Sequence, residues 1–220
     1  MLGLDQSDLT LRIGTIAAIS IYSAVFLLLL GILLLRYIRN KKDRRRLAVT
    51  EIWRPLLAEC VVEVPATLPP LTTRDHLVLL YLWNHCYESI RGDARANLIE
   101  LARRTGSDQF AKELLHARLL RRRLLAIVTL GHLQERSIWN ELAGMLQADN
   151  AFLSLVAAKA LLHIDAQGAV PLIIPVISQR KDWSPLKVVA IFEPAGADIA
   201  AEAIAEAACL ASPEIGSRLI

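Results

Sequence analysis

The residues best suited to chemistry lie in the stretch "NHCYES", where a histidine, a cysteine and a glutamate follow one another closely. A thiol nucleophile needs a base within hydrogen-bond reach and a third group that orients this base. On a helix His85 and Glu88 share one face, whereas Cys86 is turned about 100° away from His85. Because no second cluster completes the arrangement, we interpret the stretch as the polar edge of a packed helix and assign no catalytic residue.

Metal and cofactor sites have no recognisable signature in the chain. The three cysteines are widely spaced, and no CxxC, HExxH or zinc-ligand spacing occurs. A phosphate-binding glycine loop, a dinucleotide fingerprint and a hydrolase elbow are not found either. His132 and His163 occupy matching positions in a repeat described below, which favours a hydrogen bond between repeats over metal ligation. We therefore expect no metal, no cofactor and no enzymatic activity.

Arg118, Arg121 and Arg122 form the most concentrated basic feature in the second half of the chain. On a helix these side chains would share one face. Two interpretations stay open: the face is simply solvated, or it contacts an acidic partner segment or phospholipid. We retain the three arginines as candidate partner-binding residues.

The element expected to position the rest of the chain at a membrane is an uncharged apolar run from Ile13 to Leu35. A helix of this length spans roughly 34 Å, enough to cross a hydrocarbon core of about 30 Å. A single segment in lipid must satisfy its own backbone hydrogen bonds, which requires a helix. The acidic flank before it and its length argue against a cleaved signal peptide. The sequence thus predicts a short non-cytoplasmic N-terminus, residues 1–12, and a transmembrane helix, residues 13–35.

A basic run directly follows this predicted span. It sets the orientation, because positive flanks stay in the cytoplasm, so the N-terminus is expected outside and the rest of the chain inside, with the bacterial inner membrane as the expected location. Each basic side chain near the surface also attracts anionic lipid headgroups by about 1 kcal/mol. The predicted membrane-surface residues are Arg36, Arg39, Lys41, Lys42, Arg44, Arg45 and Arg46.

Small residues recur along the predicted span at intervals that suit helix packing. Such residues let two membrane helices approach closely, although small residues are also common in spans by chance. The candidate transmembrane packing face comprises Gly14, Ala17, Ala24 and Gly31.

The charge balance limits the possible partners. The chain has a formal net charge of +3, and the basic run after the span supplies more than this, so residues 47–220 are slightly acidic. A slightly acidic soluble part argues against general nucleic-acid binding. Basic residues nevertheless predominate over residues 91–123, which leaves nucleic-acid binding through that region as an alternative.

Between the span and the repeats, residues 36–72 are predicted to form a basic juxtamembrane helix, interrupted near Pro55, and a Pro-rich linker. A helix capped by Thr73 or Asp75 is then predicted to run to about Ile90. It carries three aromatic residues, Tyr81, Trp83 and Tyr87, and we expect it to pack on the first repeat.

An internal repeat of about 31 residues organises the remainder of the chain. A shift of this length places Ala126 on Ala157 and Leu130 on Leu161. Each unit contains two amphipathic helical patterns, separated at 131–136 in one unit and at 165–168 in the next. Such pairs bury their faces by stacking on neighbours, which predicts an α-solenoid. The units lie near 93–117, 119–148, 152–180 and 184–211, and an incomplete unit, 212–220, leads us to expect a longer chain or a partner that covers this end.

The stretches "AIVTLGHL" and "AAKALLHIDAQGAVPLI" resemble HEAT repeats of the short kind also found in phycobilisome lyases. Their first helix is matched by Ala157, Ala158, Ala160, Leu161 and Ile164, and the opening of their second helix by Ala169, Val170, Pro171 and Leu172. The Val-Arg pair that often precedes the double alanine is Leu155-Val156 here. The resemblance implies a right-handed solenoid over residues 73–220 and, for most HEAT proteins, binding of proteins or peptides.

The predicted fold class is therefore all-α, with a single N-terminal transmembrane helix followed by a right-handed α-solenoid of HEAT-like helix pairs. The predicted function is that of a non-catalytic scaffold or adaptor that binds a membrane-associated protein partner, with no nucleic acid and no metal expected. A lyase or isomerase of the phycobilisome-lyase kind remains the alternative from another functional class.

Overall fold

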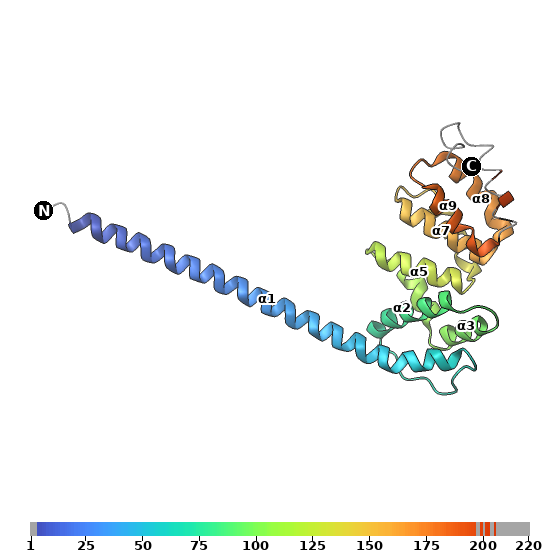
Figure 1. The fold of residues 1–220 in the computed structure, drawn as a ribbon, viewed down its shortest axis with the longest axis horizontal. Coiled ribbons are helices and arrows are strands. Elements are labelled where there is room, and N and C mark those ends of the chain that lie inside the picture. Colours follow the sequence, from blue (N-terminus) through green and yellow to red (C-terminus); the bar gives the residue numbers. More distant parts are fainter. Residues whose placement is uncertain (1–3, 197–198, 200, 203–204, 206–220) are drawn as a thin grey trace. The chain divides into compact units, whose positions relative to one another are not determined.

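The computed structural model of the chain describes residues 4–196, 199, 201–202 and 205, with side chains from Tyr22 onward except those of Lys42 and Pro194. Within these residues every regular element is a helix and no strand forms, as the sequence predicts (Figure 1). The abundance of Ala and Leu favours this outcome, because both residues lose little free energy on entering a helix. The chain divides into two compact units, residues 1–49 and 50–220.

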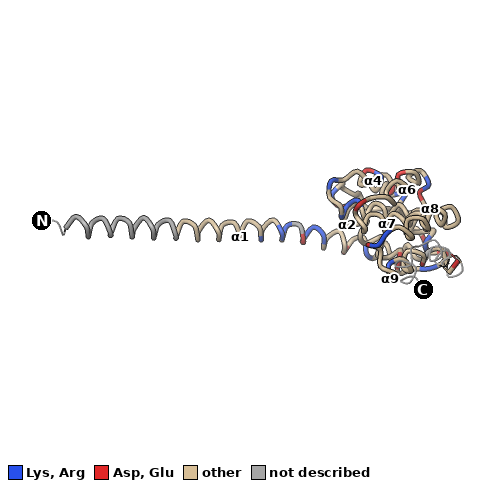
Figure 2. The backbone as a smooth tube through the Cα atoms, turned by 90° about the horizontal axis from the view of Figure 1, so that it is seen from above, with Lys and Arg blue, Asp and Glu red and all other residues tan. Residues whose placement is uncertain are grey.

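Helix α1 runs from Leu4 to Cys60 and supplies nearly all of the first unit. Its segment from Tyr22 onward is long and apolar enough to cross a membrane, and large side chains such as Phe26 and Leu28 are exposed along it. Figure 2 shows that Lys and Arg gather on one stretch of α1, which corresponds to residues 36–46.

The candidate packing face of this helix is only partly described. Gly31 has open space where a Cβ would stand, and Ala24 is exposed. The Gly14 and Ala17 positions lie outside the residues whose side chains are described, as does the side chain of Lys42.

The predicted interruption near Pro55 is wrong, because α1 continues through this proline to Cys60. Pro55 removes one backbone donor, but Pro55 and Glu51, whose carbonyl loses its partner, are both exposed residues. The opposite side buries Trp53, Leu57 and Cys60, spaced four and three residues apart. Burial of this stripe holds the helical turn that the proline weakens.

The second unit consists of short helices joined by tight connections. The helix predicted after the Pro-rich linker is present and begins at Thr73, with Thr72 in the N-cap position. The elements are α2 (Thr73–Ser89), α3 (Ala94–Arg104), α4 (Ser107–Leu114), α5 (Leu120–His132), the 3-10 turn η1 (Arg136–Ile138), α6 (Trp139–Met145), α7 (Ala151–Ile164), α8 (Ala166–Gln179), α9 (Pro185–Ile191) and the 3-10 turn η2 (Glu193–Ala195). Part of the predicted unit 184–211 and the incomplete unit 212–220 lie outside the described residues.

Four of these helices form a row in which each packs on the next. Helix α2 contacts α5, α5 contacts α7, and α7 contacts α9 (Figure 1). Helix α4 packs beside this row against α5, and both α6 and α8 pack against α7. Residues matched by the 31-residue shift, such as Ala126 with Ala157 and Leu130 with Leu161, are fully buried in this core.

The closest approach in the row occurs between α5 and α7 at Gly131. A Cβ at this position would lie 2.8 Å from the Cβ of Ala160 and 2.9 Å from its Cα. Gly131 therefore lies inside α5 and does not begin the break predicted over 131–136; the break starts after His132. Glycine is present here because no side chain fits between the two backbones.

The connection between α7 and α8 is a single residue, Asp165. Its carboxylate accepts a hydrogen bond from the backbone N–H of Gly168 (Oδ1···N 3.1 Å) and caps α8. Because α8 already begins at Ala166, Pro171 does not open the second helix as the repeat pattern predicts. Pro171 and Pro175 instead lie inside α8 on its exposed face, where the carbonyls that they leave unpaired can bind water.

Residues 50–72 belong to the second unit. The guanidinium of Arg104 donates hydrogen bonds to the carbonyls of Pro65 (3.0 Å) and Ala66 (2.9 Å), and the amide of Asn97 donates to the carbonyl of Val62 (3.3 Å). The Pro-rich segment is thus attached to α3, so the compact unit begins at Thr50 rather than at the start of the predicted repeat domain.

Candidate binding cleft

The three candidate arginines do not share one helix face. Arg118 precedes α5 in the connection from α4, whereas Arg121 and Arg122 lie in the first turn of α5. All three side chains are exposed. Arg121 and Arg122 lie near the positive end of the α5 helix dipole, where a cation is unfavourable. The first turn of α5 contains no acidic residue that would offset this effect.

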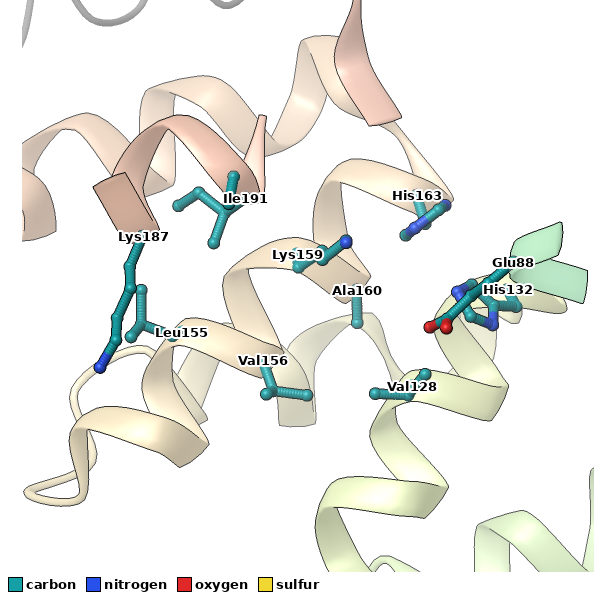
Figure 3. Close-up of a pocket in the computed structure, with 11 residues that line it drawn as sticks. Glu88, Val128, His132, Leu155, Val156, Lys159, Ala160, His163, Lys187 and Ile191 are labelled. Carbon is teal, nitrogen blue, oxygen red and sulfur yellow. The ribbon is translucent and has the colours of Figure 1, made fainter. Parts of the chain in front are cut away.

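A cleft opens elsewhere, along the row formed by α5, α7 and α9. Its inner part, which we call the apolar chamber, has a volume of about 300 Å³. Aliphatic side chains from all three helices line it: Val128, Leu155, Val156, Ala160, Ala190 and Ile191. Figure 3 shows Glu88 and His132 at one end of this chamber and Lys187 at the other.

An aromatic and histidine stack forms one end of the chamber. The rings of Trp83 and Tyr87 lie 5.2 Å apart, and those of Tyr87 and His132 lie 4.5 Å apart in a stacked arrangement. The His163 ring meets His132 edge-on, with 4.8 Å between centroids. The two histidines matched by the 31-residue shift therefore meet through a ring contact, and the hydrogen bond that His132 makes joins it to Asn84 of α2.

Asn84 of α2 determines which nitrogen of His132 carries the proton. The Asn84 amide nitrogen donates to the carbonyl of Leu80 and to the hydroxyl of Thr129, both at 2.8 Å. Its carbonyl oxygen must then accept from His132, and the Nδ1 atom lies 2.9 Å away. A neutral His132 thus has its proton on Nδ1, and its Nε2 is left as an acceptor.

Both histidines are neutral at physiological pH. Burial is the main cause that lowers the pKa of His132 to about 3, with contributions from the neighbouring His163 and from the positive charges of Lys159 and Arg95. Burial is also the main cause that lowers the pKa of His163 to about 4, with contributions from Lys159 and Arg95 that Glu193 partly offsets. The same two cations therefore oppose protonation of both rings.

A second cavity of about 600 Å³, the polar mouth, adjoins the chamber and shares Glu88, His132, Lys159 and His163 with it. Its other walls are Tyr87, Arg91, Arg95 and Glu193. Arg95 lies over the Tyr87 ring at 4.9 Å and donates to the carbonyl of Ile90 (2.7 Å). Lys159 is 3.5 Å from a carboxylate oxygen of Glu193, whose side chain is 72% exposed. We refer to the apolar chamber and the polar mouth together as the cleft.

The residues first considered for chemistry are not assembled for it. Glu88 borders the cleft, but His85 is exposed and does not line it. Burial raises the pKa of the Cys86 thiol and raises that of Cys60 to about 11, so both thiols stay protonated and weakly nucleophilic at neutral pH. Among the residues that the structure describes, no three metal-ligating side chains come together.

Most of the cleft could not be recognised in the sequence. Lys159 has no distinguishing spacing, and Arg91 and Arg95 belong to the basic region 91–123 but meet Lys159 only in the fold. The match between His132 and His163 was a second signal, and it identifies the point where α5 and α7 touch. The membrane-surface side chains described within residues 36–46 are exposed.

Searches of known proteins found no matching family model, no matching curated protein and no matching solved structure for this chain.

Proposed function

We propose that the chain is a membrane-anchored, non-catalytic scaffold of HEAT-like helix pairs that binds a protein partner at the cytoplasmic face of a membrane. Helix α1 is the anchor in this proposal, and the second unit is a right-handed solenoid that presents the cleft to the partner.

The apolar part of α1 supports the anchor. Its large side chains are exposed to a degree that water disfavours, and an isolated apolar helix needs lipid or a partner to cover it. The basic stretch after it supports an orientation with the second unit in the cytoplasm, because positive flanks are retained there. The same stretch is suited to bind anionic headgroups.

The spacing of the helices supports the repeat. Helix α5 begins at Leu120 and α7 at Ala151, which reproduces the 31-residue interval found in the sequence. Their contact at Gly131 and Ala160 leaves no room for a side chain at position 131. A row of helices built from such repeats buries its core between neighbours and leaves one long face for binding.

The single observation that carries the binding proposal is the cleft. It combines an aliphatic floor with cationic side chains at its rim, and binding sites are commonly apolar concavities with few polar groups that fix orientation. Three consecutive helices of the row contribute to it, as expected for a site that uses the repeat itself.

The test is quantitative capture of crosslinked proteins from membranes. Ala190→Trp fills the cleft from α9, where Ala190 is exposed at the chamber wall. Leu186→Trp is the matched control on the same helix, because Leu186 is 84% exposed and does not line the cleft. We expect the wild type and Leu186→Trp to enrich the same protein, and Ala190→Trp to lose at least about tenfold of it, which corresponds to about 1.4 kcal/mol of binding free energy.

Equal capture by Ala190→Trp and Leu186→Trp would exclude the cleft as the binding site. Failure of the wild type to enrich any protein over membranes that lack the chain would exclude the scaffold function. A third sample, with residues 1–46 replaced by an unrelated single-span anchor, separates tethering from recognition. Loss of the partner from that sample alone would assign recognition to the native span instead of the second unit.

A further inference from the structure

We propose that the cleft binds an acidic and apolar peptide segment, with an aliphatic side chain in the apolar chamber and an adjacent carboxylate at Lys159 in the polar mouth. This inference rests on the proposed function and specifies the chemistry of the partner.

The chamber selects an aliphatic group by size and lining. Its volume of about 300 Å³ exceeds that of a single side chain and suits one or two branched aliphatic residues. The walls are Val, Leu, Ile and Ala side chains, which gain free energy when they exclude water against another hydrocarbon surface. His132 and His163 do not oppose this, because both are held neutral by burial.

The charges around the cleft select an anion. Four cationic side chains line its two parts, Arg91, Arg95, Lys159 and Lys187, against two acidic ones, Glu88 and Glu193. Lys187 is held away from the mouth, because its ammonium lies 4.7 Å from the centroid of the Phe152 ring. The remaining three cations surround the mouth, where the field of Lys159 and Arg95 reaches both histidine rings.

Lys159 lies where the apolar chamber meets the polar mouth, because its side chain lines both cavities. In Figure 3 the Lys159 side chain extends toward His163 and away from Lys187. Its contact with Glu193 is long and mostly exposed, and such pairs contribute little to stability. A carboxylate that arrives with an aliphatic anchor can therefore take the place of Glu193 at Lys159 at small cost.

The experiment measures the histidine signals of the full chain in detergent, with ¹³C-labelled imidazoles, during titration with blocked tripeptides. The probes are N-acetyl-Leu-Glu-Leu-amide, its Gln counterpart without the charge, and N-acetyl-Ala-Glu-Ala-amide without the aliphatic groups. We expect the Leu-Glu-Leu probe to shift the His132 and His163 signals to saturation. The other two probes should bind about tenfold more weakly, because each lacks one of the two interactions.

Matched variants locate the two interactions. Lys159→Met should reduce binding of the Leu-Glu-Leu probe to the level of the Gln probe and leave the Gln probe unchanged. Arg103→Met, an exposed cation of α3 that does not line the cleft, should change neither. Ala190→Trp should weaken both leucine probes, whereas Leu186→Trp should not. Circular dichroism melts confirm that each variant is folded before it is titrated.

The inference is overturned if the Gln probe binds as tightly as the Glu probe, or if no probe shifts the two signals of the folded chain. It is also overturned if a single-stranded oligothymidine shifts the same signals and displaces the Leu-Glu-Leu probe, because the cleft would then be a nucleic-acid site. If Ala190→Trp loses the captured partner but no probe binds to the folded chain, the scaffold function stands and only this ligand class is rejected.

Discussion

Replacing Gly131 by alanine tests the packing on which the row of helices depends. The new methyl carbon would lie 2.8 Å from Ala160 Cβ and 2.9 Å from Ala160 Cα. Non-bonded carbon atoms prefer about 3.5–4.0 Å, so α5 and α7 must separate by up to about 1 Å where they cross. Because one of the atoms is backbone, no rotamer change relieves the contact.

Two opposing terms set the size of the effect. Overpacking of a buried site costs about 1–3 kcal/mol, and alanine gains about 1 kcal/mol over glycine in a helix interior. The clash lies in the interface between α5 and α7, where both helices are buried. We therefore expect the free-energy cost of overpacking to exceed the gain in helix propensity and to destabilise the unit by about 1–2 kcal/mol. Gly144→Ala is the matched control, because Gly144 lies in α6 with open space around its Cβ position. It should stabilise the unit by about 0.4–1 kcal/mol.

The assay is urea unfolding of the full chain in detergent, followed by tryptophan fluorescence. All four tryptophans, Trp53, Trp83, Trp139 and Trp183, lie in residues 50–220, so the signal reports the second unit and not the apolar part of α1. An increase in the urea midpoint for Gly131→Ala, equal to that for Gly144→Ala, would refute the close approach of α5 and α7.

Three further outcomes follow from the same structure. The pKa values of His132 and His163, about 3 and about 4, lie below the ordinary value of 6.5. At pH values between these lowered pKa values and 6.5, the unfolded chain therefore binds more protons than the folded chain. The free energy of unfolding should therefore fall by about 2 kcal/mol per histidine between about pH 7 and about pH 5; urea midpoints at the two pH values measure it, and His132→Gln with His163→Gln should remove most of the difference. Asn84→Leu removes the buried hydrogen bonds of Asn84 and leaves the Nδ1–H of His132 without its acceptor, so it should destabilise the unit by about 2 kcal/mol; an unchanged urea midpoint would contradict the hydrogen-bond network assigned to Asn84. Leu28→Arg combined with Leu33→Arg places two charges in the proposed span at about 2.5–3.5 kcal/mol each, so the variant should be released from membranes by alkaline carbonate while the wild type is retained; equal retention would argue against a transmembrane α1.

The helical class and many element positions could be predicted from the sequence because they follow from local rules. The uncharged run before Arg36 predicts one long apolar helix, and α1 contains it. The apolar spacing around Leu130 and Leu161 predicts amphipathic helices, and both residues are fully buried. Asp165 divides an apolar stretch that would otherwise be long enough to span a membrane, and α7 and α8 separate at this residue.

Helix ends were harder to predict, because tertiary contacts override the usual breakers. Pro55 does not interrupt α1, since Trp53 and Leu57 are buried on the opposite face. Gly131 does not end α5, since its lack of a side chain serves contact with α7. Arg118 falls outside α5, in the connection between Leu114 and Leu120, although no glycine or proline marks that connection.

The cleft could not be predicted because its parts are distant in the sequence. Glu88 comes from α2, Lys159 from α7 and Ala190 from α9, and only the stacking of the row brings them to one place. The pattern of apolar residues identifies which helix faces are buried. It does not show where two packed faces fail to fill the space between them, and that unfilled space is the cavity. The polar side chains at its rim have ordinary exposed positions when each helix is considered alone.

Photo-crosslinking in living cells shows whether a protein partner occupies the cleft. A benzophenone amino acid is placed at position 190, on the chamber wall, or at position 186, exposed on the same helix outside the cleft. If the partner binds in the cleft, position 190 should give one discrete protein adduct in the membrane fraction and position 186 little, and Lys159→Met should clearly reduce the position-190 adduct. Adducts of equal yield from both positions, or an adduct that Lys159→Met does not change, would show that the cleft does not hold the partner.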